Sequence, residues 1–307
     1  MKQTTDTLLM IRPKNFGYNP VTARNNLFQS KEGADNTEFI KKEALREFDL
    51  FVEVLGNAGI KVIVIEDKDS PELPDSVFPN NWISFHEEGW IITYPMFADI
   101  RSAERREDIV EKISEEFGLT KRYSFEYYEE EKMYLEGTGS MVLDRRNKIV
   151  YACISIRTEP KLLDKWAVLN NYRSVHFHAV GESGFPIYHT NVMMAMGEQY
   201  VVICWEKIDN LEEKKNLENF FKETNKEIIE ISSKQMNAFA GNMLEVRGQG
   251  RAYTVMSTEA FESLGIEQIN QFEKYTKILH SDISTIEKYG GGSVRCMMAE
   301  IFYPKMS

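Results

Sequence analysis

Near the C-terminus, Cys296 ends the segment GGGSVRC and precedes an apolar run, 297–302, with strand character. Glycines let the backbone approach a ligand closely, and free backbone N–H groups in such a turn can stabilise developing negative charge. A thiol where this turn becomes a strand is accessible, so Cys296 is a candidate nucleophile. An inert cysteine packed in the core is the alternative interpretation.

A thiol nucleophile needs a base, and His189 has the most suggestive setting of the five histidines. In PIYHTNVMMAMG it follows Pro186 and precedes an apolar, strand-like run at 192–196. It is therefore expected at the entrance of a strand, where catalytic side chains collect. A histidine that is merely packed in the core or exposed fits the same pattern.

Two carboxylates differ in setting from the many charges expected on solvated faces. Glu136, in YLEGTGS, is flanked by Leu135 and a glycine-rich turn that precedes a strand. From such a turn a carboxylate could orient the histidine or hold a substrate nitrogen. Asp75, in DSVFPNNWISF, comes just before an aromatic and asparagine-rich strand start, and an ordinary Asx turn is its alternative.

The cysteine and histidine spacings do not favour a metal site. Cys153 and Cys204 complete an odd set of three cysteines without a CxxC spacing, which argues against a disulfide framework and a thiolate zinc site. His176 and His178 lie two residues apart and would share a strand face, but no third ligand is evident. We expect reduced thiols, a structural role for this histidine pair, and no metal or other cofactor.

Short strands and amphipathic helices must position these residues. Their alternation, without a linker or low-complexity tract, predicts one α/β domain. The strand-like runs are 7–13, 59–66, 89–95, 148–156, 199–205, 242–248, 251–257 and 296–302. The helical patterns are Thr37–Asn57, 102–117, Pro160–Asn170, 210–224, 266–279 and 282–288.

The composition narrows the class of partner. Of the 307 residues, 42% are hydrophobic and 28% charged, and no apolar run approaches the roughly 18 residues that a membrane helix needs. A net charge of −11 opposes a large phosphate-binding surface. We therefore expect a cytoplasmic protein with a small-molecule partner and neither a nucleic-acid nor a membrane partner, while a homo-oligomer remains open. The short apolar core of the N-terminal segment does not predict a signal peptide.

Taken in order, Asp75 with FPNNW, EGTGS, SIRT, HTNV, GNMLEV and GGGSVRC resemble the motifs of the guanidino-group-modifying superfamily, the penteins. That superfamily includes arginine deiminases, dimethylarginine hydrolases and amidinotransferases. The N-terminal MIRPKNFGYNP and the FPNNW segment look most like the bacterial hydrolases associated with citrulline use. The resemblance spans nearly the whole chain. It implies one catalytic domain over residues 1–307, built as a five-module α/β propeller with pseudo-fivefold symmetry and an active site in the central channel.

The resemblance also implies catalytic roles for three residues. Cys296 matches the family's nucleophile, His189 its general acid and base, and Glu136 the acid of its Glu-Gly-Gly-Asp motif. Here Thr138 and Gly139 replace the last two positions of that motif.

Further positions match the groups that hold the substrate. Asp75 matches the carboxylate that grips the terminal nitrogens, and Arg157 the arginine of a Ser-x-Arg-Thr motif. Either Arg101 or Arg105 is expected to bind the amino-acid carboxylate as a bidentate pair. Asn191 stands where arginine deiminases carry an acid, and its amide suits a neutral ureido group because it offers both a donor and an acceptor.

The resemblance therefore implies a cysteine-dependent hydrolase, with citrulline converted to ornithine, ammonia and carbon dioxide as the favoured reaction. A thiolate divides the attack on a resonance-stabilised carbon into two easier steps. Arginine deiminase, dimethylarginine hydrolase and amidinotransferase activities remain alternatives, because sequence does not distinguish water from an amine as acceptor. A non-catalytic binding module, like the ribosome anti-association factor of this fold, is a further alternative.

Overall fold

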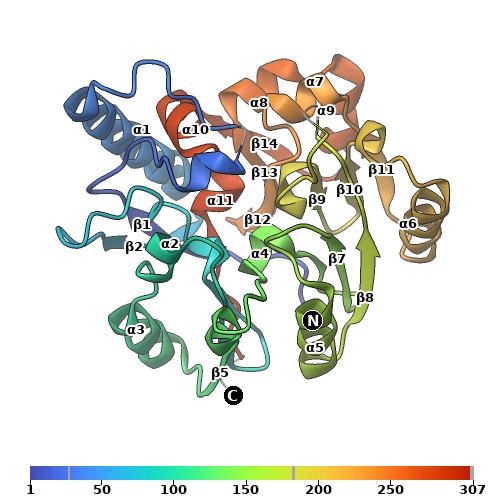
Figure 1. Cartoon of the computed structure of the whole chain (residues 1–307). Coiled ribbons are helices and arrows are strands. Elements are labelled where there is room, and N and C mark those ends of the chain that lie inside the picture. Colours follow the sequence, from blue (N-terminus) through green and yellow to red (C-terminus); the bar gives the residue numbers. More distant parts are fainter. Residues whose placement is uncertain (27, 182–183, 305–307) are drawn as a thin grey trace.

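The computed structural model describes residues 1–26, 28–181 and 184–304, and its strands form five three-stranded sheets (Figure 1). In each sheet an inner strand pairs antiparallel with a middle strand, which pairs parallel with an outer strand. The five-module α/β propeller expected from the resemblance is confirmed. From inner to outer strand, the sheets are β15 (Ala299–Glu300), β1 (Thr7–Arg12) and β2 (Lys61–Glu66); β3 (Ile83–Phe85), β4 (Trp90–Thr93) and β5 (Lys121–Ser124); β6 (Val142–Asp144), β7 (Ile149–Cys153) and β8 (Arg173–Phe177); β9 (Met194–Met196), β10 (Tyr200–Ile203) and β11 (Glu227–Glu230); β12 (Leu244–Gly248), β13 (Arg251–Ser257) and β14 (Lys277–Ser281).

The first sheet joins the two ends of the chain. Its inner strand, β15, comes from the C-terminal region and pairs with β1 through Leu8 opposite Glu300 and Leu9 opposite Ala299. The segment that carries Cys296 is thereby fixed to the N-terminal module. Closing the ring in this way leaves no module without its inner strand.

Helices connect the middle and outer strands of each sheet, because parallel neighbours need a crossover connection. In Figure 1 these helices form the periphery around the sheets. The crossover helices are α1 (Thr37–Asn57), α2 (Asp99–Ser102) with α3 (Glu107–Phe117), α5 (Pro160–Asn170), α6 (Leu211–Glu223), and α8 (Thr258–Ser263) with α9 (Ile266–Glu273).

Short helices occupy the ends of the inner strands, nearer the centre of the ring. They are η2 (Pro79–Asn81), α4 (Gly137–Ser140), η4 (Thr190–Val192) and α11 (Val294–Met297), and each directly precedes an inner strand. The other short helices are η1 (Thr22–Arg24), η3 (Glu126–Glu129), η5 (Trp205–Lys207), α7 (Ser233–Asn237) and α10 (Ser284–Gly290).

Burial of apolar faces explains why the strongest sequence patterns agree with the structure. In α1, Ile40, Phe48, Phe51 and Leu55 are fully or almost fully buried and recur at helical spacing. The predicted bounds of α1 and α5 are confirmed. Within the described ranges, no helix has the length and apolar character needed to cross a membrane.

Three predicted elements need correction. The helix expected at 266–279 ends at Glu273, and 277–281 forms β14. The helix expected at 102–117 begins at Glu107, after the separate α2. The strand expected after the glycine-rich turn covers only Ala299–Glu300, because Cys296 lies on the short helix α11.

Most outer strands gave no sequence signal. Residues of β5, which reads KRYS, are all exposed or half-buried, and so are those of β14 apart from its last residue, Ser281. An edge strand that packs one face on helices carries few of the apolar residues by which strands are recognised. The sequence therefore indicated the middle strands but missed β5, β8, β11 and β14.

Candidate active site

Five equivalent positions of the propeller supply the candidate residues. Asn81, Glu136, Asn191, Asn242 and Cys296 all lie in the segments just before inner strands. Because the five modules repeat the same arrangement, these segments meet at one end of the inner strands. A small cavity lies there, and its lining includes Asp75, Asn81, Arg101, Arg157, His189 and Cys296.

Cys296 is almost fully buried, with 6% of its surface exposed, and lies in the first turn of α11. Its N–H donates to the Ser293 carbonyl at 2.9 Å. Two side-chain amides are directed at its sulfur: Asn242 Nδ2 lies 3.2 Å and Asn191 Nδ2 3.5 Å from Sγ. Both N–H groups can stabilise a thiolate, since hydrogen bonds to an ionised acceptor are stronger than neutral ones.

Asn242 is a further candidate site residue, which the sequence pattern did not single out. Its Oδ1 accepts a hydrogen bond from the Arg295 N–H at 3.1 Å, which fixes the amide so that Nδ2 faces the sulfur. Nδ2 also donates to the Asn191 carbonyl at 3.0 Å. The preceding Gly241 was the available signal, because a Cβ there would lie 2.2 Å from the Val192 carbonyl oxygen.

His189 and Glu136 form a buried pair. His189 Nε2 lies 2.7 Å from Glu136 Oε2, and the other carboxylate oxygen accepts the Phe97 N–H at 2.9 Å. Arg157 Nη1 approaches the same Oε2 at 3.3 Å. A Cβ at Gly139 would lie 2.9 Å from His189 Nδ1, so this departure from the family motif leaves room for the imidazole.

The electrostatics of this pair indicate which of its groups are ionised at neutral pH. Burial lowers the pKa of His189 to about 4, and the hydrogen bond and charge of Glu136 offset it only in part. Burial opposes ionisation of Glu136, but Arg157 and His189 outweigh it and hold the pKa of that carboxyl well below its usual range. At neutral pH the carboxylate is ionised and the imidazole neutral, so Nε2 donates to Glu136. Nδ1, which has no hydrogen-bond partner in the described part of the chain, is left as the base.

Asp75 is buried at the other side of the cavity and is not an ordinary turn residue. Its Oδ2 accepts hydrogen bonds from Asn19 Nδ2 at 2.7 Å and Thr22 Oγ1 at 3.0 Å, while Oδ1 lacks a partner among the described residues. Burial raises the pKa of Asp75, although Arg101 opposes the shift. An unpartnered buried carboxylate oxygen is costly, and a ligand N–H would satisfy it.

The two arginines considered as binders of a substrate carboxylate lie in different places. Arg101 reaches the cavity, but its guanidinium already forms a bidentate pair with Glu104 at 2.9 and 2.8 Å. Arg105 is not among the cavity residues, because it pairs with Glu129 and the Tyr94 carbonyl. The structure therefore brings Arg101 to the site and leaves Arg105 outside it.

Arg157 closes another wall of the cavity. It is buried, donates to Asn25 Oδ1 and Glu136, and lies over the Tyr188 ring at 4.9 Å from the centroid. Its Nε has no partner within the described ranges. The guanidinium thus links the covering N-terminal segment to the catalytic pair.

Two asparagines of the FPNNW segment were also missed. Asn81 Oδ1 accepts from Arg101 Nη1 at 2.9 Å, whereas its Nδ2 is buried without a partner among the residues described. Both amide atoms of Asn80 and Oδ1 of Asn191 are likewise buried without a hydrogen-bond partner among the described residues. The FPNNW motif by itself does not indicate which of its amide atoms lack a hydrogen-bond partner.

The cavity is small. It has room for about 20 Å³, enough for a water molecule but not for an amino acid. Thr22, Asn26 and Gln29 of the N-terminal segment line it, and Gln29 Nε2 donates to the Gly290 carbonyl at 2.9 Å. Binding of a larger ligand therefore requires some of the lining side chains to move.

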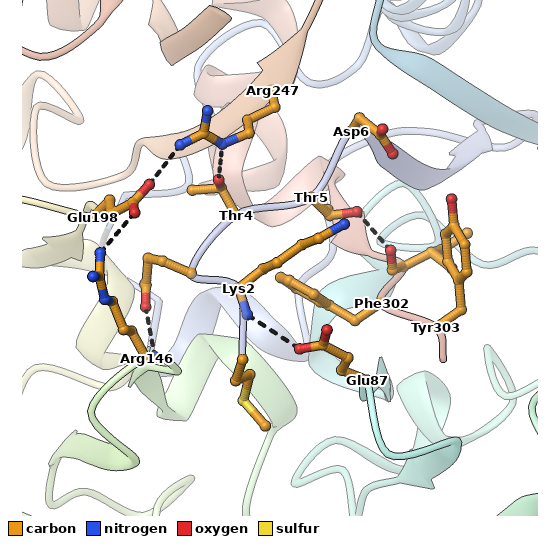
Figure 2. Close-up of a pocket in the computed structure, with 13 residues that line it drawn as sticks. Lys2, Thr4, Thr5, Asp6, Glu87, Arg146, Glu198, Arg247, Phe302 and Tyr303 are labelled. Atoms are coloured by element: carbon orange, nitrogen blue, oxygen red, sulfur yellow. Dashed lines mark hydrogen bonds and ion pairs between the residues drawn. The ribbon is translucent and has the colours of Figure 1, made fainter. Parts of the chain in front are cut away.

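A second, wider cavity of about 460 Å³ lies at the opposite end of the inner strands. Its residues Glu87, Arg146 and Glu198 follow β3, β6 and β9, whereas the candidate catalytic residues precede such strands. Figure 2 shows Glu198 between Arg146 and Arg247, with which it forms ion pairs at 2.9 and 2.6 Å. These exposed pairs are remote from the sulfur of Cys296.

The remaining thiols and histidines lie elsewhere. Burial raises the pKa of Cys153 to about 12, which opposes a nucleophilic role. His176 contacts Asp164 at 2.9 Å and His178 contacts Glu213 at 2.8 Å, both near the surface. No group of three or more potential metal-binding side chains occurs in the ranges that the structure describes.

Comparison with known proteins gave two kinds of similarity. The sequence family described as "N,N dimethylarginine dimethylhydrolase, eukaryotic" matches residues 12–303. None of the curated protein sequences matches the chain. Among solved structures, the substrate-bound N-terminal domain of ArgZ, an arginine dihydrolase from the ornithine–ammonia cycle in cyanobacteria, is similar with a TM-score of 0.75 and 15% identity over 98% of this chain and 99% of that domain.

Two further structures support the same fold. AgrE in complex with L-arginine has a TM-score of 0.76 and 15% identity over 98% of this chain, which spans only 41% of AgrE. A histidine-to-glycine variant of a dimethylarginine dimethylaminohydrolase, in adduct with S-methyl-L-thiocitrulline, has a TM-score of 0.65 and 16% identity over 96% of this chain and 98% of that one. The pentein fold is thereby confirmed.

Proposed function

The chain belongs to the N,N-dimethylarginine dimethylhydrolase family of the pentein superfamily, and from this premise we propose that it hydrolyses the ureido group of citrulline through a covalent adduct on Cys296. Its overall activity is that of a hydrolase of non-peptide C–N bonds on a small guanidino or ureido compound. The finer proposal concerns the substrate and the roles of the residues, within a single catalytic domain.

One observation carries the choice of citrulline: the unpaired buried atoms of the site include both acceptors and a donor. Asp75 Oδ1 and Asn191 Oδ1 are acceptors, and Asn81 Nδ2 is a donor. A ureido group presents N–H donors and a carbonyl acceptor, so it can satisfy both kinds. A guanidinium presents donors only and would leave the Asn81 amide hydrogens unpaired, which is costly in a buried site.

The reaction follows from the same geometry. His189 takes the proton of the Cys296 thiol as the sulfur attacks the ureido carbon, and it gives this proton to the ornithine nitrogen as the bond between that nitrogen and the carbon breaks. Ornithine leaves, and a carbamoyl group stays on sulfur. His189, neutral again, takes a proton from the water that attacks the carbamoyl carbon and returns it to the sulfur, which leaves as the thiol. The carbamic acid formed decomposes to ammonia and carbon dioxide, so citrulline and water give ornithine, ammonia and carbon dioxide.

The surrounding groups have distinct tasks in these steps. Glu136 orients His189 and stabilises the imidazolium that forms transiently. Asp75 accepts N–H bonds from the planar group and holds it in line with the sulfur. Asn242 and Asn191 donate toward Sγ, so the charge on the sulfur is stabilised before attack.

Separate incubation with citrulline, arginine, agmatine and dimethylarginine tests the proposal, with ornithine, citrulline, ammonia and dimethylamine measured. The wild type is expected to form ornithine from citrulline, Cys296→Ser to form none, and Cys204→Ser, altered at a thiol outside the cavity, to keep the activity. Formation of citrulline from arginine without ornithine from citrulline would identify a deiminase instead.

Hydrolysis of dimethylarginine to citrulline and dimethylamine is the second candidate, because the matching sequence family is described by that activity. The same incubations distinguish it. An added amine such as glycine tests for an amidinotransferase, since only a transferase would convert arginine into a guanidino product of glycine.

A further inference from the structure

A buried acidic side chain, Glu287 on α10, lies behind the turn that carries the candidate nucleophile. Only 2% of its surface is exposed, and its Oε1 accepts a hydrogen bond from Ser293 Oγ at 2.5 Å. Ser293 is the residue before α11, and its carbonyl accepts the Cys296 N–H at 2.9 Å. The carboxyl group is therefore joined to the backbone of Cys296 through one intervening residue.

The backbone of Glu287 holds the other end of the same turn. Its carbonyl accepts the N–H of Gly291 at 2.9 Å, and Gly291 ends α10 in the left-handed region with φ of +63°. The Gly291 carbonyl in turn accepts the hydroxyl of Tyr188 at 2.9 Å. Glu287 thus fixes the turn at 290–293 at both ends, once by its main chain and once by its side chain.

The surroundings of this carboxyl favour its neutral form. Burial raises the pKa of Glu287 to about 8, hydrogen bonds from Ser293 and Ser257 oppose the shift, and the acidic neighbours Glu259 on α8 and Glu47 on α1 add to it. Glu47 itself is buried and accepts N–H groups at the start of α10. No cation is paired with Glu287 among the described residues.

We infer that Glu287 is a positioning residue for Cys296, whose carboxyl group holds Ser293 and with it the geometry of the sulfur against Asn242 and Asn191. This role rests on the proposed function, since it assumes that Cys296 is the nucleophile. Loss of the hydrogen bond to Ser293 loosens the turn and slows attack by the sulfur.

Alkylation of Cys296 by iodoacetamide, followed by peptide mass at about pH 7, tests this without any substrate. Glu287→Ala and Ser293→Ala each remove the hydrogen bond and are expected to react about tenfold more slowly than the wild type. Glu287→Gln keeps an oxygen that accepts the Ser293 hydroxyl, so its rate is expected to stay within about twofold of the wild type. Recovery of the rate in this conservative variant is a result that a merely structural role of the side chain would not give.

Glu259→Gln is the matched control, because it removes a neighbouring carboxylate that does not bond Ser293, and it should react at the wild-type rate. Alanine variants that react as fast as the wild type while folded by circular dichroism, or a Glu287→Gln variant as slow as Glu287→Ala, would overturn the inference. Citrulline turnover is measured in parallel, so absence of turnover in the wild type together with slowed alkylation of the alanine variants contradicts the proposed substrate and leaves the positioning role intact.

Discussion

Removing the Asn242 side chain should both weaken the nucleophile and destabilise the fold. In Asn242→Ala, Cys296 Sγ loses a donor at 3.2 Å, while the Arg295 N–H and the Asn191 carbonyl lose their partner. A hydrogen bond to a charged group is worth roughly 1.5–3 kcal/mol, so kcat/KM should fall roughly 10- to 150-fold. The two orphaned backbone groups should together lower the free energy of unfolding by roughly 2–6 kcal/mol.

Asn242→Asp separates the two effects. It retains an acceptor for the Arg295 N–H but places a carboxylate oxygen against the sulfur, so it should react more slowly than Asn242→Ala while remaining the more stable variant. Asn170→Ala, which removes a buried amide bonded to the Trp166 carbonyl far from the cavity, is the control for stability alone. The measurements are kcat/KM, the iodoacetamide alkylation rate and the denaturation midpoint. If Asn242→Asp stayed within about twofold of the wild type in both rates, the assigned role of the amide in stabilising a charged acceptor would be refuted.

Three further predictions follow from the site. Asp75→Asn replaces the unpaired carboxylate oxygen with a neutral amide and should lower kcat/KM about 10- to 100-fold with little loss of stability; an unchanged value would contradict its contact with substrate N–H groups. Gly139→Ala should reduce turnover by displacing the Asn81 amide and the His189 ring, since its Cβ would lie 2.3 Å from Asn81 Nδ2 and 2.9 Å from His189 Nδ1, and equal activity would show that the positions of these two side chains do not matter. Because the pKa of Glu287 rises from 4.5 to about 8 on folding, its neutral form stabilises the fold fully below pH 4.5, and up to roughly 5 kcal/mol is lost as the pH rises through 8. Urea unfolding from pH 5 to 9 should show this loss in the wild type and not in Glu287→Gln, and parallel curves would count against it.

The pattern of residues along the chain was sufficient to predict the helices and strands in which apolar residues recur at a regular spacing. Helices α1 and α5 have the predicted bounds because each buries one face, and the middle strands were recognised by their β-branched and aromatic residues. The propeller itself came from the resemblance of six motifs, since alternating strands and helices fit a doubly wound sheet equally well. Apart from β2, the outer strands left no comparable pattern.

The sequence by itself determined which residue types were available for chemistry: a cysteine after a glycine-rich turn, a histidine before a strand, and the carboxylates of Glu136 and Asp75. Only the tertiary structure decided how they meet. Glu136 and His189 are 53 residues apart in sequence, and Asn242 and Cys296 are 54 apart, so their contacts depend on closure of the five-module ring. The pair of Arg101 with Glu104 is local, at a spacing of three residues, whereas the pairing of Arg105 with Glu129 and the unpaired amide atoms depend on packing between segments that no local pattern encodes.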